Sequence, residues 1–214
     1  MLTKLFFEQD SSKVAAKLLG KNIFHKHNGN WLSAQIIETE SYYLREKGSH
    51  ASLGKTKSRE ALFMPPGTIY MYYARGADSF NISCKGIGNA VLIKSAIPSK
   101  NSFNYNMIEI MKKNNPKPDG QLRESMFLCS GQTLVCKALG ITVSDWNKKE
   151  FDQKRFFIAD NMYTPNQIIQ TTRLGIPIGR DEHLLQRFID LKYVKYCTKN
   201  PLTMRIPPQY KILK

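Results

Sequence analysis

The segment QIIETESYY, residues 35–43, places four residues of chemically active types within six positions: Glu38, Glu40, Tyr42 and Tyr43. Side chains alternate along a strand, so a regular strand puts Glu38, Glu40 and Tyr42 on one face. An ionised carboxylate is buried only when it is paired, hydrogen-bonded or catalytic. The spacing leaves two interpretations open, a functional use of at least one glutamate and a solvated strand edge.

Further tyrosines follow in the segment GTIYMYY, residues 67–73, where Tyr70 and Tyr72 share a strand face. By themselves they are typical core or sheet-surface residues. Next to a carboxylate in a basic protein, they also suit a stacking pocket for a base that has been taken out of its duplex. Arg75, in the turn that follows, suits insertion into the minor groove or filling of the gap that the base leaves.

The charge balance indicates a polyanionic partner. The chain has 32 Lys and Arg against 17 Asp and Glu, a net charge of +15. Residues 191–214 contain six basic residues and no acid, and Asp78 is the only acid in residues 61–108. Nucleic acid is the leading candidate. Lysines that only keep a basic protein soluble are the alternative, so charge alone assigns no function.

Composition also argues against several protein classes. The apolar runs are shorter than a bilayer span and no signal peptide follows Met1, so we expect a cytoplasmic protein without membrane association. His25 and His27 share a strand face but lack a third ligand nearby, and we interpret them as ordinary strand residues. Neither C-x-x-C spacing nor a zinc pattern occurs, so free thiols are expected at Cys84, Cys129, Cys136 and Cys197. We expect neither a metal nor a cofactor.

Helices and hairpin-linked strands alternate without regular βαβ order. Residues 10–20 predict a short helix, and residues 22–27 and 31–43 predict strands joined by the turn NGN. Further strands are predicted at 67–73, 80–84 and 89–98. Further helices are predicted in the middle of 98–121, at 129–141 with Ser130 as N-cap, and at 181–188. We predict an α+β fold in one domain, 1–214, with a curved, largely antiparallel sheet, flanking helices and a protruding hairpin that carries Arg75.

Several motifs together carry a family resemblance. The order and near-spacing of IIETESYY, SHAS, FMPPGTIYMYYARG, FNIS, AVLIKSAIP and LCSGQTLVCKALGI resemble the alkyladenine (3-methyladenine) DNA glycosylase family. The match covers about residues 2–141 and continues more weakly around TTRLGIPIG and the basic end. The resemblance implies a base-excision repair enzyme that flips an alkylated or deaminated purine out of duplex DNA and hydrolyses its N-glycosidic bond.

The resemblance also implies residue roles. Glu40 matches the general base, and Tyr42 and His50 match residues that contact the flipped base. Tyr72 matches the residue that stacks on the other face of the base, and Asn81 matches the asparagine that crowds the exocyclic amino group of normal guanine. Glu38 is then interpreted as a structural carboxylate with a local partner, and Tyr43 as a sheet aromatic that points the other way.

Two positions depart from the family pattern. Lys94 stands where the family usually has an arginine near the catalytic water, and Lys lacks the planar fork that holds two partners. Arg75 stands where a bulky residue, often tyrosine, fills the vacated place in the stack. The interval from Glu40 to His50 is also one residue shorter than in better-known members.

The chemistry is consistent with this resemblance. Cleavage of an N-glycosidic bond passes through an oxocarbenium-like sugar, which a carboxylate stabilises while it deprotonates water. No lysine other than Lys94 is placed as a Schiff-base nucleophile, so we expect water attack without strand cleavage. The expected partner is double-stranded DNA with damaged purines, bound by a monomer that is nucleoid-associated if the protein is bacterial. A non-catalytic basic nucleic-acid-binding domain and a metal-dependent nuclease are the alternatives.

Overall fold

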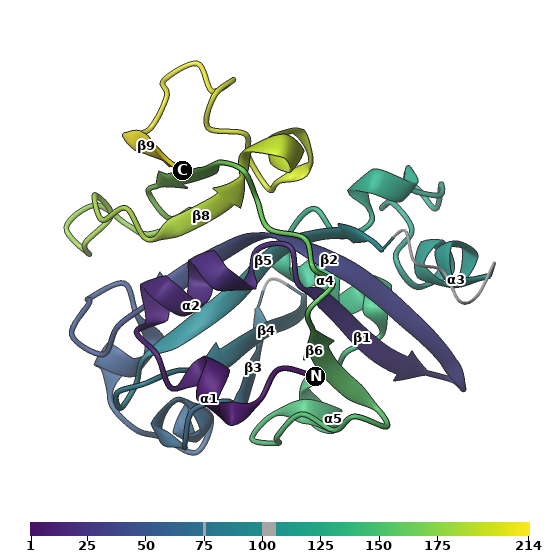
Figure 1. Ribbon diagram of the computed structural model, residues 1–214, viewed down its shortest axis with the longest axis horizontal. Coiled ribbons are helices and arrows are strands. Elements are labelled where there is room, and N and C mark those ends of the chain that lie inside the picture. Colours follow the sequence, from purple (N-terminus) through teal and green to yellow (C-terminus); the bar gives the residue numbers. More distant parts are fainter. Residues whose placement is uncertain (75, 100–105) are drawn as a thin grey trace.

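The computed structural model describes residues 1–74, 76–99 and 106–214 of the protein (Figure 1). Its helices are α1 (Lys4–Phe7), α2 (Ser11–Leu18), α3 (Met107–Asn114), α4 (Gln132–Leu139) and α5 (Val143–Trp146), with 3-10 helices η1 (His50–Leu53), η2 (Glu60–Phe63), η3 (Ser125–Phe127) and η4 (Leu191–Tyr196). Its strands are β1 (Asn22–His27), β2 (Asn30–Tyr42), β3 (Ile69–Ala74), β4 (Ala77–Ser83), β5 (Ala90–Pro98), β6 (Phe156–Ala159), β7 (Ile168–Thr171), β8 (Arg187–Asp190) and β9 (Tyr210–Leu213).

Nine strands of the described chain form one sheet with antiparallel pairings. The order is β3-β4-β5-β2-β8-β7-β9, and β1 pairs with β2 and β6. Helix α2 packs on β2 and β5, and α4 packs on β4 and β5. Figure 1 shows β8, β9 and the neighbouring 3-10 helix at one end of the molecule, apart from β1 and β6. The predicted α+β class with an antiparallel sheet is confirmed.

The long strand β2 organises the sheet. It pairs with β5 along one edge, while the other edge pairs with β1 near its start and with β8 over Glu38–Glu40. The pairing with β5 is irregular, because Glu38 lies opposite Ser95 whereas Thr39 lies opposite Ile93. Ile37 on β2 and Lys94 on β5 are both skipped at this point, so the two shifts offset each other and the register is the same on either side. Lys94 thus lies across the strand pair from the two glutamates.

The turn between β1 and β2 confirms the predicted hairpin. Asn28 and Gly29 both have positive φ, 48° and 80°, as a two-residue turn matched to the strand twist requires. The helix that precedes it is also confirmed, and the Asp10 side chain accepts hydrogen bonds from the backbone amides of Ser12 and Lys13. The chain therefore begins its sheet at the predicted places.

Two predictions at the other end of the chain need correction. The helix predicted at 181–188 is absent from this described segment: residues 181–184 form a turn and β8 begins at Arg187. Strand pairing to β2 buries Phe188 and Ile189, to 2% and 0% exposure, and this packing overrides the helical pattern. Helix α4 has Gly131 as its N-cap instead of Ser130, whose hydroxyl donates to the Tyr196 carbonyl.

None of the helices in the described part of the chain has the length and apolar character that a membrane-spanning helix needs.

Candidate active site

A cavity of about 360 Å³ opens between the end of β2, the hairpin β3–β4 and the segment around residue 176. Its walls include five of the residues to which the family resemblance assigned positions in the site, and these come from five different elements. They are Tyr42, His50, Tyr72, Asn81 and Lys94. Other lining residues include Leu53, Leu62, Tyr70, Gln132, Leu174 and Arg180. The predicted wedge residue Arg75 lies outside the described residues.

Glu40 lies directly behind this cavity and is fully buried, with 0% exposure. The Tyr42 hydroxyl donates to its Oε2 at 2.7 Å, and the backbone amide of Leu174 donates to its Oε1 at 3.1 Å. The Lys94 ammonium stands 3.4 Å from both carboxylate oxygens. Three groups that border the cavity thus converge on one carboxylate, and the interpretation of a solvated strand edge is wrong.

The surroundings of Glu40 keep it ionised. Burial by itself raises the pKa of a carboxyl group, but the Lys94 charge, the Tyr42 hydroxyl, the Arg187 charge and the Leu174 amide outweigh it. The pKa of Glu40 is therefore below its ordinary value of 4.5. A carboxylate with this pKa is available at neutral pH to accept a proton or to stabilise a developing positive charge.

Aromatic rings form the walls of the cavity. The His50 and Tyr72 ring centroids are 4.5 Å apart, and those of Tyr70 and Tyr72 are 5.6 Å apart. His50 Nδ1 and the Tyr70 hydroxyl share a hydrogen bond of 3.0 Å. Burial, followed by the charges of Arg59 and Arg180, lowers the pKa of His50, so its imidazole is neutral at physiological pH.

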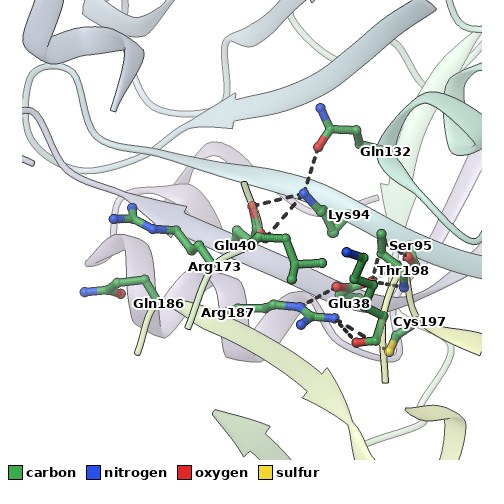
Figure 2. A network of polar contacts seen from close by, with 12 residues as sticks. Glu38, Glu40, Lys94, Ser95, Gln132, Arg173, Gln186, Arg187, Cys197 and Thr198 are labelled. Carbon is green, nitrogen blue, oxygen red and sulfur yellow. Dashed lines mark hydrogen bonds and ion pairs between the residues drawn. The ribbon is translucent and has the colours of Figure 1, made fainter. Parts of the chain in front are cut away.

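Glu38 has a different set of partners, which Figure 2 shows beside those of Glu40. Arg187 Nε donates to Glu38 Oε1 at 2.6 Å, and both side chains have 0% exposure. The Thr198 amide donates to Oε2 at 2.8 Å, and the Ser95 hydroxyl donates to the same oxygen. The carboxylate thereby joins β2 to β5, β8 and the C-terminal segment. The prediction of a structural Glu38 with a basic partner agrees with this geometry.

The remaining sequence candidates fall outside the cavity. Tyr43 points away from it, and its hydroxyl contacts Asp10 and Ser12 near the start of α2. His25 is buried in the core, where Nδ1 donates to the Leu139 carbonyl and Nε2 accepts from Trp146. Both ring nitrogens of His25 therefore have protein partners. Among the described residues no group of three or more His, Cys, Asp or Glu has the arrangement of a metal site.

The sequence did not single out several residues of the site. Gln132, at the first position of α4, contacts both Lys94 and Tyr72. The Arg173 guanidinium lies 4.5 Å from the centroid of the Tyr42 ring, and Leu174 supplies the amide for Glu40. The similarity around TTRLGIPIG was a signal for the last two, whereas Gln132 was seen only as part of a predicted helix.

Comparison with known proteins places this chain in a family. The family described as methylpurine-DNA glycosylase matches residues 5–193. A Pseudomonas syringae pv. tomato protein is 56% identical over 198 residues, which cover 92% of this chain and 89% of that protein. A Pseudomonas aeruginosa PAO1 protein is 53% identical over 202 residues, covering 94% of this chain and 84% of that protein.

A more distant relative matches over almost the whole chain as well. A Carboxydothermus hydrogenoformans protein is 33% identical over 203 residues, covering 93% of this chain and 99% of that protein. All three relatives are provisionally named 3-methyladenine DNA glycosylases. The resemblance inferred from the motifs is confirmed, and the chain belongs to the methylpurine-DNA glycosylase family, whose members are hydrolases that act on N-glycosyl bonds.

Proposed function

We propose that this protein removes alkylated or deaminated purines of the 3-methyladenine and hypoxanthine type from duplex DNA. The base leaves the duplex, enters the cavity, and is released when water attacks the sugar carbon. Glu40 deprotonates this water. The proposal rests above all on one observation: a buried carboxylate with a lowered pKa lies behind a cavity lined by aromatic rings.

One carboxylate serves two purposes in this reaction. The bond to the base weakens as positive charge develops on the sugar, and the ionised Glu40 stabilises that charge. The same carboxylate takes the proton of the attacking water. Lys94, Tyr42 and the Leu174 amide support both roles, because their contacts favour the ionised form of Glu40.

The cavity recognises the base. At about 360 Å³ it is near the lower end of ligand-pocket sizes, which suits one base rather than a nucleotide. Tyr42 contacts one face of the base and Tyr72 stacks on the other, with His50 at its edge. Asn81 also lines the cavity and crowds the exocyclic amino group of guanine, which excludes the normal base. A purine that is already cationic leaves with little acid assistance.

Lys94 acts as a charge rather than as a nucleophile. Its ammonium is held between the Glu40 carboxylate and the Gln132 amide oxygen. A Schiff base requires this nitrogen to attack the sugar carbon, whereas both of these partners engage it. The enzyme is therefore monofunctional: it hydrolyses the glycosidic bond and leaves the DNA strand intact.

The whole chain, 1–214, acts as one catalytic domain and binds duplex DNA as a monomer. Its net charge of +15 supports attraction to the phosphates. As the family resemblance implies, Arg75 fills the space that the flipped base leaves in the stack.

The test is release of free base from a duplex with one hypoxanthine or one 3-methyladenine, in the presence of a chelator. We expect release by the wild-type protein, with strand breaks only after alkali treatment. Glu40→Gln is expected to slow release by about 10²–10⁴-fold, as for loss of a general base, while still binding the damaged duplex. Glu109→Gln, a surface change on α3, is the matched control and is expected to keep full activity.

Each component of the proposal has its own contrary result. If the wild-type protein binds damaged DNA but releases neither base, it is a binding domain. Full activity of Glu40→Gln contradicts the role of Glu40. Strand breaks without alkali contradict the monofunctional reaction.

A further inference from the structure

We propose that Gln132 is a positioning residue of this active site, which fixes the Lys94 ammonium beside Glu40 and the Tyr72 ring against the cavity. This inference builds on the proposed function, because it assigns to Gln132 an effect on the rate of base release through those two residues. In this role Gln132 acts through its contacts with Lys94 and Tyr72.

The contacts of one amide group carry the inference. The Gln132 side-chain oxygen accepts from Lys94 Nζ at 3.0 Å. Its nitrogen donates to the Tyr72 hydroxyl at 3.2 Å and to the Ser79 hydroxyl at 2.9 Å. These partners lie on β5, β3 and β4, so the first residue of α4 connects three strands around the cavity. Figure 2 shows the Gln132 amide oxygen directed at the Lys94 ammonium.

Lys94 needs such a partner more than an arginine would. Its ammonium is a point charge on a flexible stem, whereas a guanidinium holds two acceptors in a rigid fork. Strand β5 fixes the backbone of Lys94 but not the end of its stem, so the position of the ammonium depends on the groups that it contacts. Its distance to Gln132, 3.0 Å, is shorter than its 3.4 Å to either Glu40 oxygen. Of these two partners of the Lys94 ammonium, the Gln132 amide oxygen is therefore the closer one.

Removal of this amide has a specific consequence for Glu40. Lys94 on β5, Tyr42 on β2, Arg187 on β8 and the Leu174 amide favour the ionised carboxylate, against the effect of burial. When Lys94 is no longer held, the largest of these favourable effects weakens. The pKa of Glu40 then rises, and the acid limb of the rate profile moves to higher pH. A residue that only stabilised the fold would leave that limb unchanged.

The experiment compares Gln132→Ala with wild type in single-turnover release of hypoxanthine across pH. We expect the rate at neutral pH to fall about tenfold, the loss typical of one charge-assisted hydrogen bond. Affinity for the damaged duplex is expected to stay within about twofold, and the acid midpoint is expected to rise. Gln170→Ala removes a comparable amide, which donates to the Leu185 carbonyl away from the cavity, and is expected to behave as wild type.

Lys94→Arg provides a rescue arm. In the Gln132→Ala background the space left by the amide is expected to accommodate the larger guanidinium. Its two parallel N–H groups can bind both Glu40 oxygens without a second partner to position them. We expect Gln132→Ala/Lys94→Arg to release base several-fold faster than Gln132→Ala. A wild-type rate and midpoint for Gln132→Ala, or a loss of rate with an unchanged midpoint and no rescue, overturns the inference.

A second readout separates this inference from the proposed function. The Glu40 carboxylate is titrated by carbon-13 NMR in the protein without DNA, in wild type and in Gln132→Ala. A higher pKa in the variant supports the positioning role even if no base is released by either protein. An equal pKa in the two proteins rejects the role whatever the activity assay shows.

Discussion

Glu38 and Glu40 are two positions apart on one strand, and both have 0% exposure, yet they contact different cations. Arg187 holds Glu38 at 2.6 Å, with Thr198 and Ser95 completing its shell. The partners of Glu40 include side chains that also line the cavity. Of the two carboxylates, Glu40 is the one whose hydrogen bonds in the described chain join it to residues that line the cavity, and for that reason the catalytic role is proposed for it alone.

Removal of the Tyr42 hydroxyl tests whether a single hydrogen bond lowers the pKa of Glu40. Burial raises the pKa of Glu40 while Lys94 and then the Tyr42 hydrogen bond lower it, so Tyr42→Phe is expected to raise this pKa. In the proposed reaction the rate requires ionised Glu40, so activity is present above this pKa and is lost as pH falls through it. The acid midpoint of base release should move to higher pH, with a rate loss at neutral pH of about tenfold.

Tyr43→Phe is the matched control for this change. Its hydroxyl contacts Asp10 and Ser12 instead of the cavity, so the acid midpoint should equal that of wild type. The measurement is the pH profile of single-turnover release for both variants. Equal midpoints for Tyr42→Phe and wild type would show that the hydroxyl does not tune Glu40.

At the scale of elements, the sequence predicted turns and helix ends whose structure depends on the residues at those positions. The Asn28–Gly29 turn and the Asp10 cap depend on the residues at those positions, and the sequence predicted both elements. Residues 181–188 depend instead on a distant strand: β8 forms because β2 offers pairing and burial. Nothing local in that segment distinguishes an amphipathic helix from such a strand.

The active site shows the same difference between features that local sequence determines and features that tertiary packing determines. The resemblance gave five cavity residues because they lie on recognisable motifs. Lys94 is two positions from Leu92, the partner of Glu40 on β5, so strand alternation places the lysine on the side of the sheet where Glu40 lies. Gln132 reaches the cavity because α4 packs on β4 and β5, a tertiary arrangement that helical periodicity does not encode. Motifs therefore identify the participants, and packing determines which of them touch.

The buried pair of Glu38 and Arg187 is expected to hold β8 and the C-terminal segment on β2. Arg187→Met leaves the Glu38 carboxylate buried without its cation, which costs about 3–5 kcal/mol in free energy of unfolding. Adding Glu38→Gln removes the uncompensated charge, so the double variant should recover a large part of that loss. Urea denaturation measures all three proteins.

An exposed ion pair provides the comparison. Lys4 and Glu150 are 2.7 Å apart with more than half of each side chain exposed, and Glu150→Gln should leave stability nearly unchanged. If Arg187→Met were equally harmless, the Glu38–Arg187 pair would have no part in joining β8 to β2. If the double variant were as unstable as Arg187→Met, contacts of Arg187 other than Glu38, such as the Lys199 carbonyl, would carry the effect.

At the scale of the whole molecule, the positive charge extends to the mouth of the cavity. Arg180 lines the cavity, and its charge, like that of Arg59, contributes to the lowered pKa of His50 after the effect of burial. Both guanidiniums donate to backbone carbonyls, Arg180 to Lys47 and Arg59 to Leu53 and Gly54. These contacts fix the Arg180 guanidinium at the cavity wall and hold Arg59 to the chain at Leu53, another lining residue.

This arrangement predicts how DNA affinity depends on salt. Each phosphate neutralised by the protein adds about 0.9 to the slope of log affinity against log salt. Arg180→Gln is expected to weaken binding to damaged and undamaged duplexes alike and to reduce the slope by about one, while Arg180→Lys keeps the charge and the slope. Fluorescence anisotropy over a salt series measures both variants. An unchanged slope for Arg180→Gln would mean that this guanidinium contacts no phosphate and that the charge acting on His50 serves the cavity alone.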